Sequence, residues 1–266
     1  MCVQCMELQH NHLKNQQCKA CELVKQFIHG ESKEQRKKRK QLEKSKNQTV
    51  VTSIVAPITL ETGTADNATK KVAFVLGNGV SRADINPADL KRYGVIYGCN
   101  ALFRSYAPDH LIAVDTKMIR EITQDGYHNT HSVWTNASKY TREIPNLNLF
   151  TPTLGWSSGP SALNLASNHG YDTIYILGFD YVGVGKNNEL VNNMYAGTHN
   201  YKQISERATY FGNWQRQTAT CIKKNTKVKY IRVIDTQSSY VPEPLIGLTN
   251  LTHFTVENFK NRFNIM

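Results

Sequence analysis

The segment KVAFVLGNGVS, residues 71–81, decides the expected fold of this chain. Its first half, residues 71–76, is a short apolar run with the length and composition of a buried strand. Gly77-Asn78-Gly79 then breaks the run into a tight turn, because glycine adopts backbone angles that other residues avoid. The segment therefore predicts a strand followed at once by a loop whose backbone amides can face an anion.

The rest of residues 71–266 repeats this pattern of short apolar runs, several of which end in Gly, Asn or Asp. Five further strands are expected, at residues 95–97, 111–114, 147–150, 173–177 and 229–234. Segments with helical spacing lie between several of them, including residues 158–169 and a stretch from about 203 to 224. Strands that alternate with helices imply a mainly parallel sheet covered on both faces. We expect a doubly wound, Rossmann-like α/β domain over residues 71–266.

The ends of the expected strands predict where a ligand binds. In open parallel sheets, ligands bind at the edge formed by the carboxyl ends of the strands. Asn78 offers this edge a side-chain donor and acceptor, and the hydroxyl of Ser81 can bond a phosphate or cap the next helix. The loop is neither a dinucleotide G-x-G-x-x-G motif nor a P-loop. Together with the other strand ends, it predicts a site for a nucleotide or a nucleotide-like ligand.

Bulk properties limit the class of protein. The chain has 266 residues, of which 40% are hydrophobic, which is enough for one α/β domain with an appendage. No segment reaches the roughly 18 apolar residues of a membrane span. The N-terminal residues show no secretory signal pattern, so we expect a cytoplasmic protein, in the host cytoplasm if the source is viral. The net charge of +11 favours an anionic partner, such as a nucleic acid, a nucleotide or an anionic membrane surface.

Four cysteines crowd residues 1–30 in a Cys-x2-Cys, twelve-residue, Cys-x2-Cys pattern: Cys2, Cys5, Cys18 and Cys21. Two such chelating pairs can close a tetrahedron of thiolates around Zn²⁺. The loop between them is too polar to form a core, so a bound metal would supply the folding energy. We expect a structural zinc module here; the alternative is an N-terminus without metal and with reduced thiols.

Residues 31–70 form a polar and charged connector, which we expect to be a flexible linker. Residues 33–46 are rich in Lys and Arg and contain almost no apolar residue. Such a run is usually a solvated linker. Next to a zinc module it is also a candidate arm for contacts with nucleic-acid phosphates, without base readout. Both interpretations stay open.

Three motifs in the order of the chain resemble a known family. They are Gly-Asn-Gly-x-Ser after the first strand, Gly-Cys-Asn at 98–100, and the stretch WSSGPSA at 156–162 that leads to YILGFDY at 175–181. In this order they resemble bacterial CMP-sialic-acid-dependent sialyltransferases, over roughly residues 71–201. The first part is also similar to pterin diphosphokinase-like proteins, through Val114-Asp115 at a strand end. The segment YGCNAL at 97–102 further resembles uncharacterised phage proteins.

The sialyltransferase resemblance implies a set of nucleotide contacts. Residues at the first loop, at the second strand end, at a helix N-terminus and after the Gly-x-Asp turn would contact the phosphate, sugar or base. These are Gly77, Asn78, Gly79, Ser81, Asn100, Ser157, Ser158, Gly159, Tyr181 and either Tyr195 or Tyr201. The residues themselves add Asp115, which can bind a ribose or Mg²⁺ at the sheet edge or cap the helix after it.

The same resemblance implies that a histidine removes the proton from the acceptor, and His199 is the best match in position. An exposed loop histidine is the other interpretation of His199. Two features depart from the family: Val80 stands where proline is common, and residues 182–194 are unlike its acceptor-recognising lid. We expect Asp180 to be structural and to tie loops together.

Three functions follow as expectations. The first is a nucleotide-sugar-dependent glycosyltransferase with a basic, zinc-containing N-terminal arm. The second is a non-catalytic protein that binds a nucleotide and nucleic acid. The third is a diphosphokinase-like transferase, which would need Mg²⁺ near Asp115.

Overall fold

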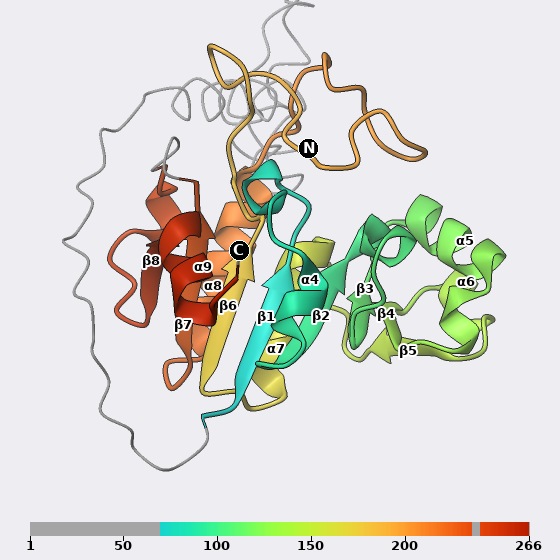
Figure 1. The fold of residues 1–266 in the computed structure, drawn as a ribbon. Helices are drawn as coiled ribbons and strands as arrows, with labels where there is room; N and C mark the ends of the chain where they lie inside the picture. Colours follow the sequence, from blue (N-terminus) through green and yellow to red (C-terminus); the bar gives the residue numbers. More distant parts are fainter. Residues whose placement is uncertain (1–69, 236–239, 266) are drawn as a thin grey trace, which may run out of the picture. The chain divides into compact units, whose positions relative to one another are not determined.

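The computed structural model describes residues 70–235 and 240–265. Within them lies a sheet of eight strands in the order β5-β4-β3-β2-β1-β6-β7-β8 (Figure 1). Every neighbouring pair of these strands is parallel, which confirms the expected mainly parallel α/β fold. The strands are β1 (Val72–Leu76), β2 (Val95–Cys99), β3 (His110–Ile112), β4 (Val133–Asn136), β5 (Leu147–Phe150), β6 (Thr173–Leu177), β7 (Lys229–Ile234) and β8 (Leu251–Thr255).

Helices connect the strands and cover both faces of the sheet (Figure 1). The α-helices are α4 (Pro87–Leu90), α5 (Thr116–Asp125), α6 (Lys139–Arg142), α7 (Ser158–Asn168), α8 (Gly212–Lys224) and α9 (Val256–Phe263). The 3-10 helices are η2 (Val80–Arg82), η3 (Asn100–Arg104), η4 (Tyr127–Asn129) and η5 (Glu243–Leu245).

Side chains of β1 alternate between two apolar cores, because successive residues of a strand point to opposite faces. Ala73 and Val75 pack into one core with α7 and α8. Phe74 and Leu76 pack into the other with α4, α5 and α9. All four side chains are at most 1% exposed, so β1 lies at the centre of the domain and its C-terminal loop is held in a fixed place.

The strand order reverses at β1. The chain runs outward from β1 to β5 on one side and then returns to place β6 on the other side of β1. At such a switch point the loops after the two central strands diverge and leave a crevice, where ligands of doubly wound sheets bind. Here these loops are residues 77–79 after β1 and 178–181 after β6.

The sequence-based elements agree with the structure except in three places. The strands β4 and β8 were not expected: β4 has only four residues, and β8 alternates with polar residues and is mostly half-buried. The helix expected from about residue 203 begins only at Gly212, since residues 182–211 form a long connection with two isolated β-bridges.

The expected zinc module and basic linker, residues 1–70, lie outside the described residues except for Lys70. Within the part of the chain that the structure describes, no group of three His, Cys, Asp or Glu side chains is arranged to hold a metal ion. In the same part, no helix is both long enough and apolar enough to cross a membrane.

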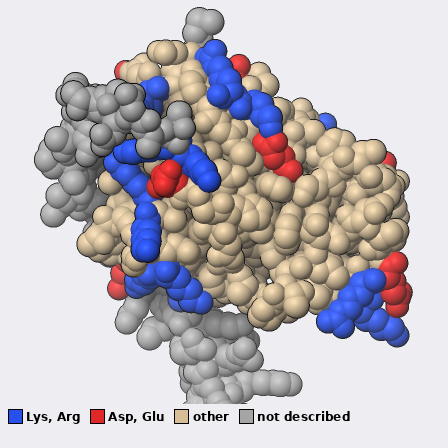
Figure 2. Space-filling model, turned by 90° about the horizontal axis from the view of Figure 1, so that it is seen from below, with Lys and Arg blue, Asp and Glu red and all other residues tan. Residues whose placement is uncertain are grey.

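The charge on one face of the molecule is dispersed. Figure 2, which looks from below Figure 1, shows Lys and Arg side chains in separate groups near the rim, with a wide area of uncharged atoms between them. A nucleic-acid backbone would need a continuous basic surface. The described residues on this face offer no such continuous surface.

Candidate functional site

A cavity of about 640 Å³ lies at the carboxyl edge of the sheet, at the switch point. Its volume is in the range of small-molecule sites, about 300–1,000 Å³. It is lined by the loops after β1, β2, β3 and β6, by the N-terminus of α7, by the start of α8 and by residues of the 182–211 connection. Segments that are far apart in sequence therefore form one site.

Most of the residues singled out from the sequence line this cavity. The structure brings together Gly77, Asn78, Gly79, Asn100, Asp115, Ser157, Ser158, Gly159 and Tyr181. Ser81, Tyr201 and His199 are not among the lining residues. Ser81 instead lines a smaller cavity of about 240 Å³, which also includes Asp180 and Arg232.

The N-terminus of α7 faces the cavity with free backbone donors. Ser157 is the N-cap residue, and its side chain makes no capping bond. Pro160 carries no N–H, and the amide of Ser161 already donates to the carbonyl of Ser157 at 3.0 Å. The amides of Ser158 and Gly159 are left without an acceptor among the described residues. They lie at the positive end of the helix dipole, where anions bind.

The side chain of Ser158 fixes this helix end to two neighbouring strands. Its hydroxyl donates to Asn100 Oδ1 at 2.8 Å and accepts from the amide of Val114 at 3.1 Å. The loops after β2 and β3 are thus joined to α7 at the floor of the site. This bond also fixes the orientation of the Asn100 side chain, whose oxygen accepts from Ser158.

The loop at residues 77–81 does not present its glycine amides to an anion, contrary to the expectation from sequence. Four amides of this loop donate to other parts of the protein instead. The bonds run from Gly77 N to Leu177 O (2.8 Å), from Gly79 N to Gly178 O (2.9 Å), from Val80 N to Asn192 Oδ1 (2.9 Å) and from Ser81 N to Asp180 Oδ2 (3.1 Å). The hydroxyl of Ser81 also donates to Asp180, at 2.5 Å. As expected, Asp180 ties two loops together.

The glycines serve the close packing of two turns. A Cβ on Gly77 would lie 2.6 Å from the carbonyl oxygen of Gly178, and a Cβ on Gly79 would lie 2.5 Å from the carboxyl carbon of Asp180. Side-chain carbons do not approach other atoms this closely. Glycine is therefore needed here because the loops after β1 and β6 touch.

Asn78 offers the cavity an acceptor without a partner. Its Nδ2 donates to the hydroxyl of Tyr201 at 3.1 Å, and its buried Oδ1 has no hydrogen-bond partner among the described residues. The Asn78 residue is only 9% exposed, so bulk water cannot fully solvate that oxygen. Tyr201 lies behind Asn78 and accepts a second bond from the amide of Ala101, at 3.4 Å. Burial raises the pKa of Tyr201, which keeps its hydroxyl neutral.

Tyr181 lines the cavity, but its hydroxyl is already bonded within the protein. The hydroxyl bonds Thr218 Oγ1 on α8 at 2.6 Å, and the residue is only 5% exposed. Burial raises the pKa of Tyr181 well above its ordinary value. A phosphate contact through this hydroxyl, as the resemblance implies, would have to share it with Thr218.

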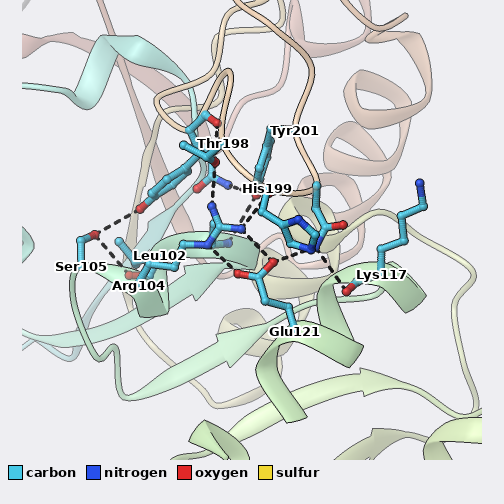
Figure 3. Close-up of polar contacts among 12 residues, drawn as sticks. Leu102, Arg104, Ser105, Lys117, Glu121, Thr198, His199 and Tyr201 are labelled. Carbon is cyan, nitrogen blue, oxygen red and sulfur yellow. Dashed lines mark hydrogen bonds and ion pairs between the residues drawn. The ribbon is translucent and has the colours of Figure 1, made fainter. Parts of the chain in front are cut away.

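His199 lies on the surface, next to an ion pair (Figure 3). Arg104 on η3 donates twice to Glu121 on α5, at 2.6 and 2.8 Å. The same guanidinium donates to Thr198 Oγ1 at 2.7 Å and to the carbonyl oxygen of His199 at 2.8 Å. Burial alone would raise the pKa of Glu121, but hydrogen bonds from Arg104 and Asn200 hold it below its ordinary value. Arg104 and Glu121 thus hold residues 198–200 against η3 and α5, because Asn200 Nδ2 also donates to Glu121 at 2.7 Å.

No histidine is among the residues that line the main cavity, and its ionisable carboxylates are Asp115 and Asp180. Asp180 is engaged by Ser81. Asp115 is the N-cap of α5, but its side chain makes no capping bond. Its carboxylate is exposed and has no hydrogen-bond partner among the described residues. Asp115 is therefore the lining carboxylate that is free to meet a ligand.

Sequence reasoning missed the wall formed by the 182–211 connection and by α8. Asn192, Asn193, Thr209, Phe211 and Trp214 line the cavity from these segments. Among these residues, only Phe211 and Trp214 could have been found from the sequence. Their three-residue spacing is typical of aromatic side chains on one face of a helix. Asn136, the last residue of the unexpected strand β4, was missed with that strand.

Comparison of the chain with models of protein families, with curated proteins and with solved structures gives no significant match. The functional argument therefore rests on the geometry of the cavity.

Proposed function

We propose that the chain binds a nucleotide-activated donor, such as a nucleotide sugar, in the 640 Å³ cavity and transfers the activated group to an acceptor hydroxyl. One observation carries this proposal. At the switch point of a parallel sheet, one cavity combines two free helix N-terminal amides with the unpartnered Oδ1 of Asn78. The amides suit a phosphate, and the carbonyl oxygen suits a donor group such as a ribose hydroxyl or a base amino group.

In the proposed reaction the acceptor oxygen attacks the activated carbon of the donor. A new C–O bond forms, and the bond between that carbon and the phosphate oxygen breaks with both electrons going to the phosphate. The nucleotide leaves as an anion, which the amides of Ser158 and Gly159 stabilise. The acceptor proton passes to a base, and Asp115 is the lining carboxylate with no other bond. His199, which the resemblance implies as base, is the other candidate.

A second candidate function is favoured by the position of His199. If the chain binds a nucleotide without chemistry, the cavity needs no general base, and His199 serves only in the surface cluster around Arg104. A diphosphokinase-like transfer is the third candidate. It would use Asp115 with Mg²⁺, because Mg²⁺ is often held by one or two carboxylates together with substrate phosphates.

Calorimetric titration with CMP, UDP, GDP and ATP, with and without Mg²⁺, tests binding, and sugar conjugates of the same nucleotides test turnover. We expect one nucleotide to bind selectively and Asn78→Ala to weaken it about 10-fold, the value of one buried hydrogen bond. The matched control is Asn187→Ala, an exposed asparagine outside the cavity. Binding without turnover of any conjugate would favour the non-catalytic function, and no binding would refute the proposal.

A further inference from the structure

A buried arginine without a counter-charge lies beside the cavity. Arg82 ends η2, directly after the loop at residues 77–81, and it is 2% exposed. Its Nε donates to the carbonyl oxygen of Gly77, while its buried Nη2 has no hydrogen-bond partner in the described part of the chain. Among the described residues, the ion pairs are Lys91–Asp109 and Arg104–Glu121, and neither includes Arg82. A buried charge without a partner costs stability, so its retention calls for an explanation.

A second buried arginine at the same edge has a hydrogen-bond acceptor for each of its three guanidinium nitrogens. Arg232 on β7 is also 2% exposed. Its three nitrogens donate to the carbonyl oxygens of Phe179 at 2.9 Å, Asp180 at 3.0 Å and Tyr240 at 3.0 Å. Its guanidinium also lies 5.2 Å from the ring centre of Tyr181. Arg232 thus holds the turn after β6 through its hydrogen bonds. Arg82 holds the turn after β1 in the same way, but its Nη2 has no acceptor among the described residues.

Arg82 is not itself a lining residue of the cavity, but it is bonded to one. Its bonded partner Gly77 lines the cavity, and so does Cys99. Burial raises the pKa of the Cys99 thiol to about 12, and the charge of Arg82 acts in the opposite direction. The hydrogen bond to Gly77 thus holds Arg82 next to one residue of the cavity lining. Because the surroundings are dry, its positive charge reaches the cavity with little screening.

We propose that Arg82 is the fixed counter-charge for a phosphate group bound in this cavity. The phosphate lies between the guanidinium on the side of β1 and β2 and the free amides of α7 on the other side. This inference rests on the proposed function for its cavity, and it adds the anionic class of the ligand and the residue that selects it. As the leaving nucleotide gains negative charge, a buried and preorganised cation stabilises it more than a solvated one would.

The test compares Arg82→Met with the matched control Arg232→Met, using pyrophosphate, CMP and cytidine as probes in calorimetry. We expect Arg82→Met to weaken pyrophosphate and CMP about 10- to 100-fold, on the order of the attraction between two unit charges roughly 8 Å apart in a partly buried site, and to leave cytidine unchanged. Without ligand, Arg82→Met should lower the melting temperature less than Arg232→Met does, since it removes an unpaired buried charge and leaves only the carbonyl of Gly77 without its donor. Arg232→Met should melt lower, because three carbonyls lose their donor.

The binding results for pyrophosphate and CMP test the role of Arg82 separately from the nucleotide function. Arg82-dependent binding of pyrophosphate without any binding of CMP would support the inference and refute the nucleotide function. CMP binding that survives in Arg82→Met would overturn the inference and leave the nucleotide function standing. A wild type that binds neither anion would overturn both. If Arg82→Met fails to fold, Arg82→Lys decides: it keeps the charge, so a loss of phosphate affinity beyond about 10-fold would count against a purely electrostatic role.

Discussion

Replacing Gly79 with alanine tests whether this glycine serves packing or the ligand. Gly79 has φ of −65°, which any residue adopts, so alanine adds no backbone strain. Its Cβ would, however, lie 2.5 Å from both the carboxyl carbon and Oδ2 of Asp180 and 2.7 Å from the carbonyl oxygen of Gly178. Normal contacts between carbon atoms are about 3.5–4.0 Å, so one turn must move by roughly 1 Å.

That movement would strain the bonds that join the two loops. The bond from Gly79 N to Gly178 O is 2.9 Å, and the carboxylate of Asp180 is held by Ser81. Overpacking a tight site costs about 1–3 kcal/mol, and we expect about 2 kcal/mol for Gly79→Ala. In a domain of this size each kcal/mol lowers the melting temperature by about 2–4 °C, so the expected fall is about 4–8 °C.

The assay is thermal and urea unfolding of the purified protein without ligand. Gly170→Ala is the control, because nothing lies within 4 Å of its added Cβ and only its φ of +78° opposes alanine. The control should cost about 1 kcal/mol. A Gly79→Ala protein within about 0.5 kcal/mol of the wild type would refute the packing argument. If it then lost only ligand affinity, the glycine would serve the ligand after all.

Four further results are expected. Asp115→Asn should lower turnover of the donor by about 100-fold or more with donor binding kept, whereas His199→Ala should leave turnover intact; the reverse pattern in steady-state kinetics would restore the histidine as base. Elemental analysis should find one Zn²⁺ per chain, bound by the four N-terminal cysteines, and freely titratable thiols in metal-free protein would end that expectation. Removal of residues 1–50 should weaken binding to a nucleic acid and flatten its salt dependence in fluorescence titrations, and unchanged affinity would identify the basic arm as a linker only. Burial, aided by the charge of Arg232, lowers the pKa of His253 to about 4. Because the unfolded chain then binds the extra proton, unfolding experiments should show stability lost as the pH falls from about 6.5 to 4, less so in His253→Gln.

The sequence was informative where a local pattern determines the structure. The apolar runs at residues 72–76 and 173–177 became β1 and β6, since a short run of β-branched and aromatic residues that ends at glycine is typical of a buried strand. Because carboxyl ends of parallel strands share one edge, the position of the cavity followed as well. The strand β8 was not expected, since its alternation with threonine and histidine is typical of many half-exposed segments.

Long-range partners were beyond the reach of sequence patterns. The motif at residues 77–81 looks the same whether its amides face an anion or donate to residues 177–192, and the structure shows the second arrangement. The environment of His199 depends on Arg104, which is 95 positions away in the chain. The missing partner of Arg82 is likewise invisible in a sequence, because burial and pairing are properties of the assembled domain.

Because all neighbouring strands are parallel, the cavity lies at the carboxyl edge of the sheet and the turns that enter the strands lie at the amino edge. The turns at the amino edge of the sheet lie away from the cavity. The turn at Gly170, which precedes β6, contributes no lining residue. Changes in the connections at the carboxyl edge therefore alter the cavity lining without touching the turns at the opposite edge. For protein engineering, this makes the turn at Gly170 a suitable place for a reporter or an inserted module, because it is open and outside the cavity lining.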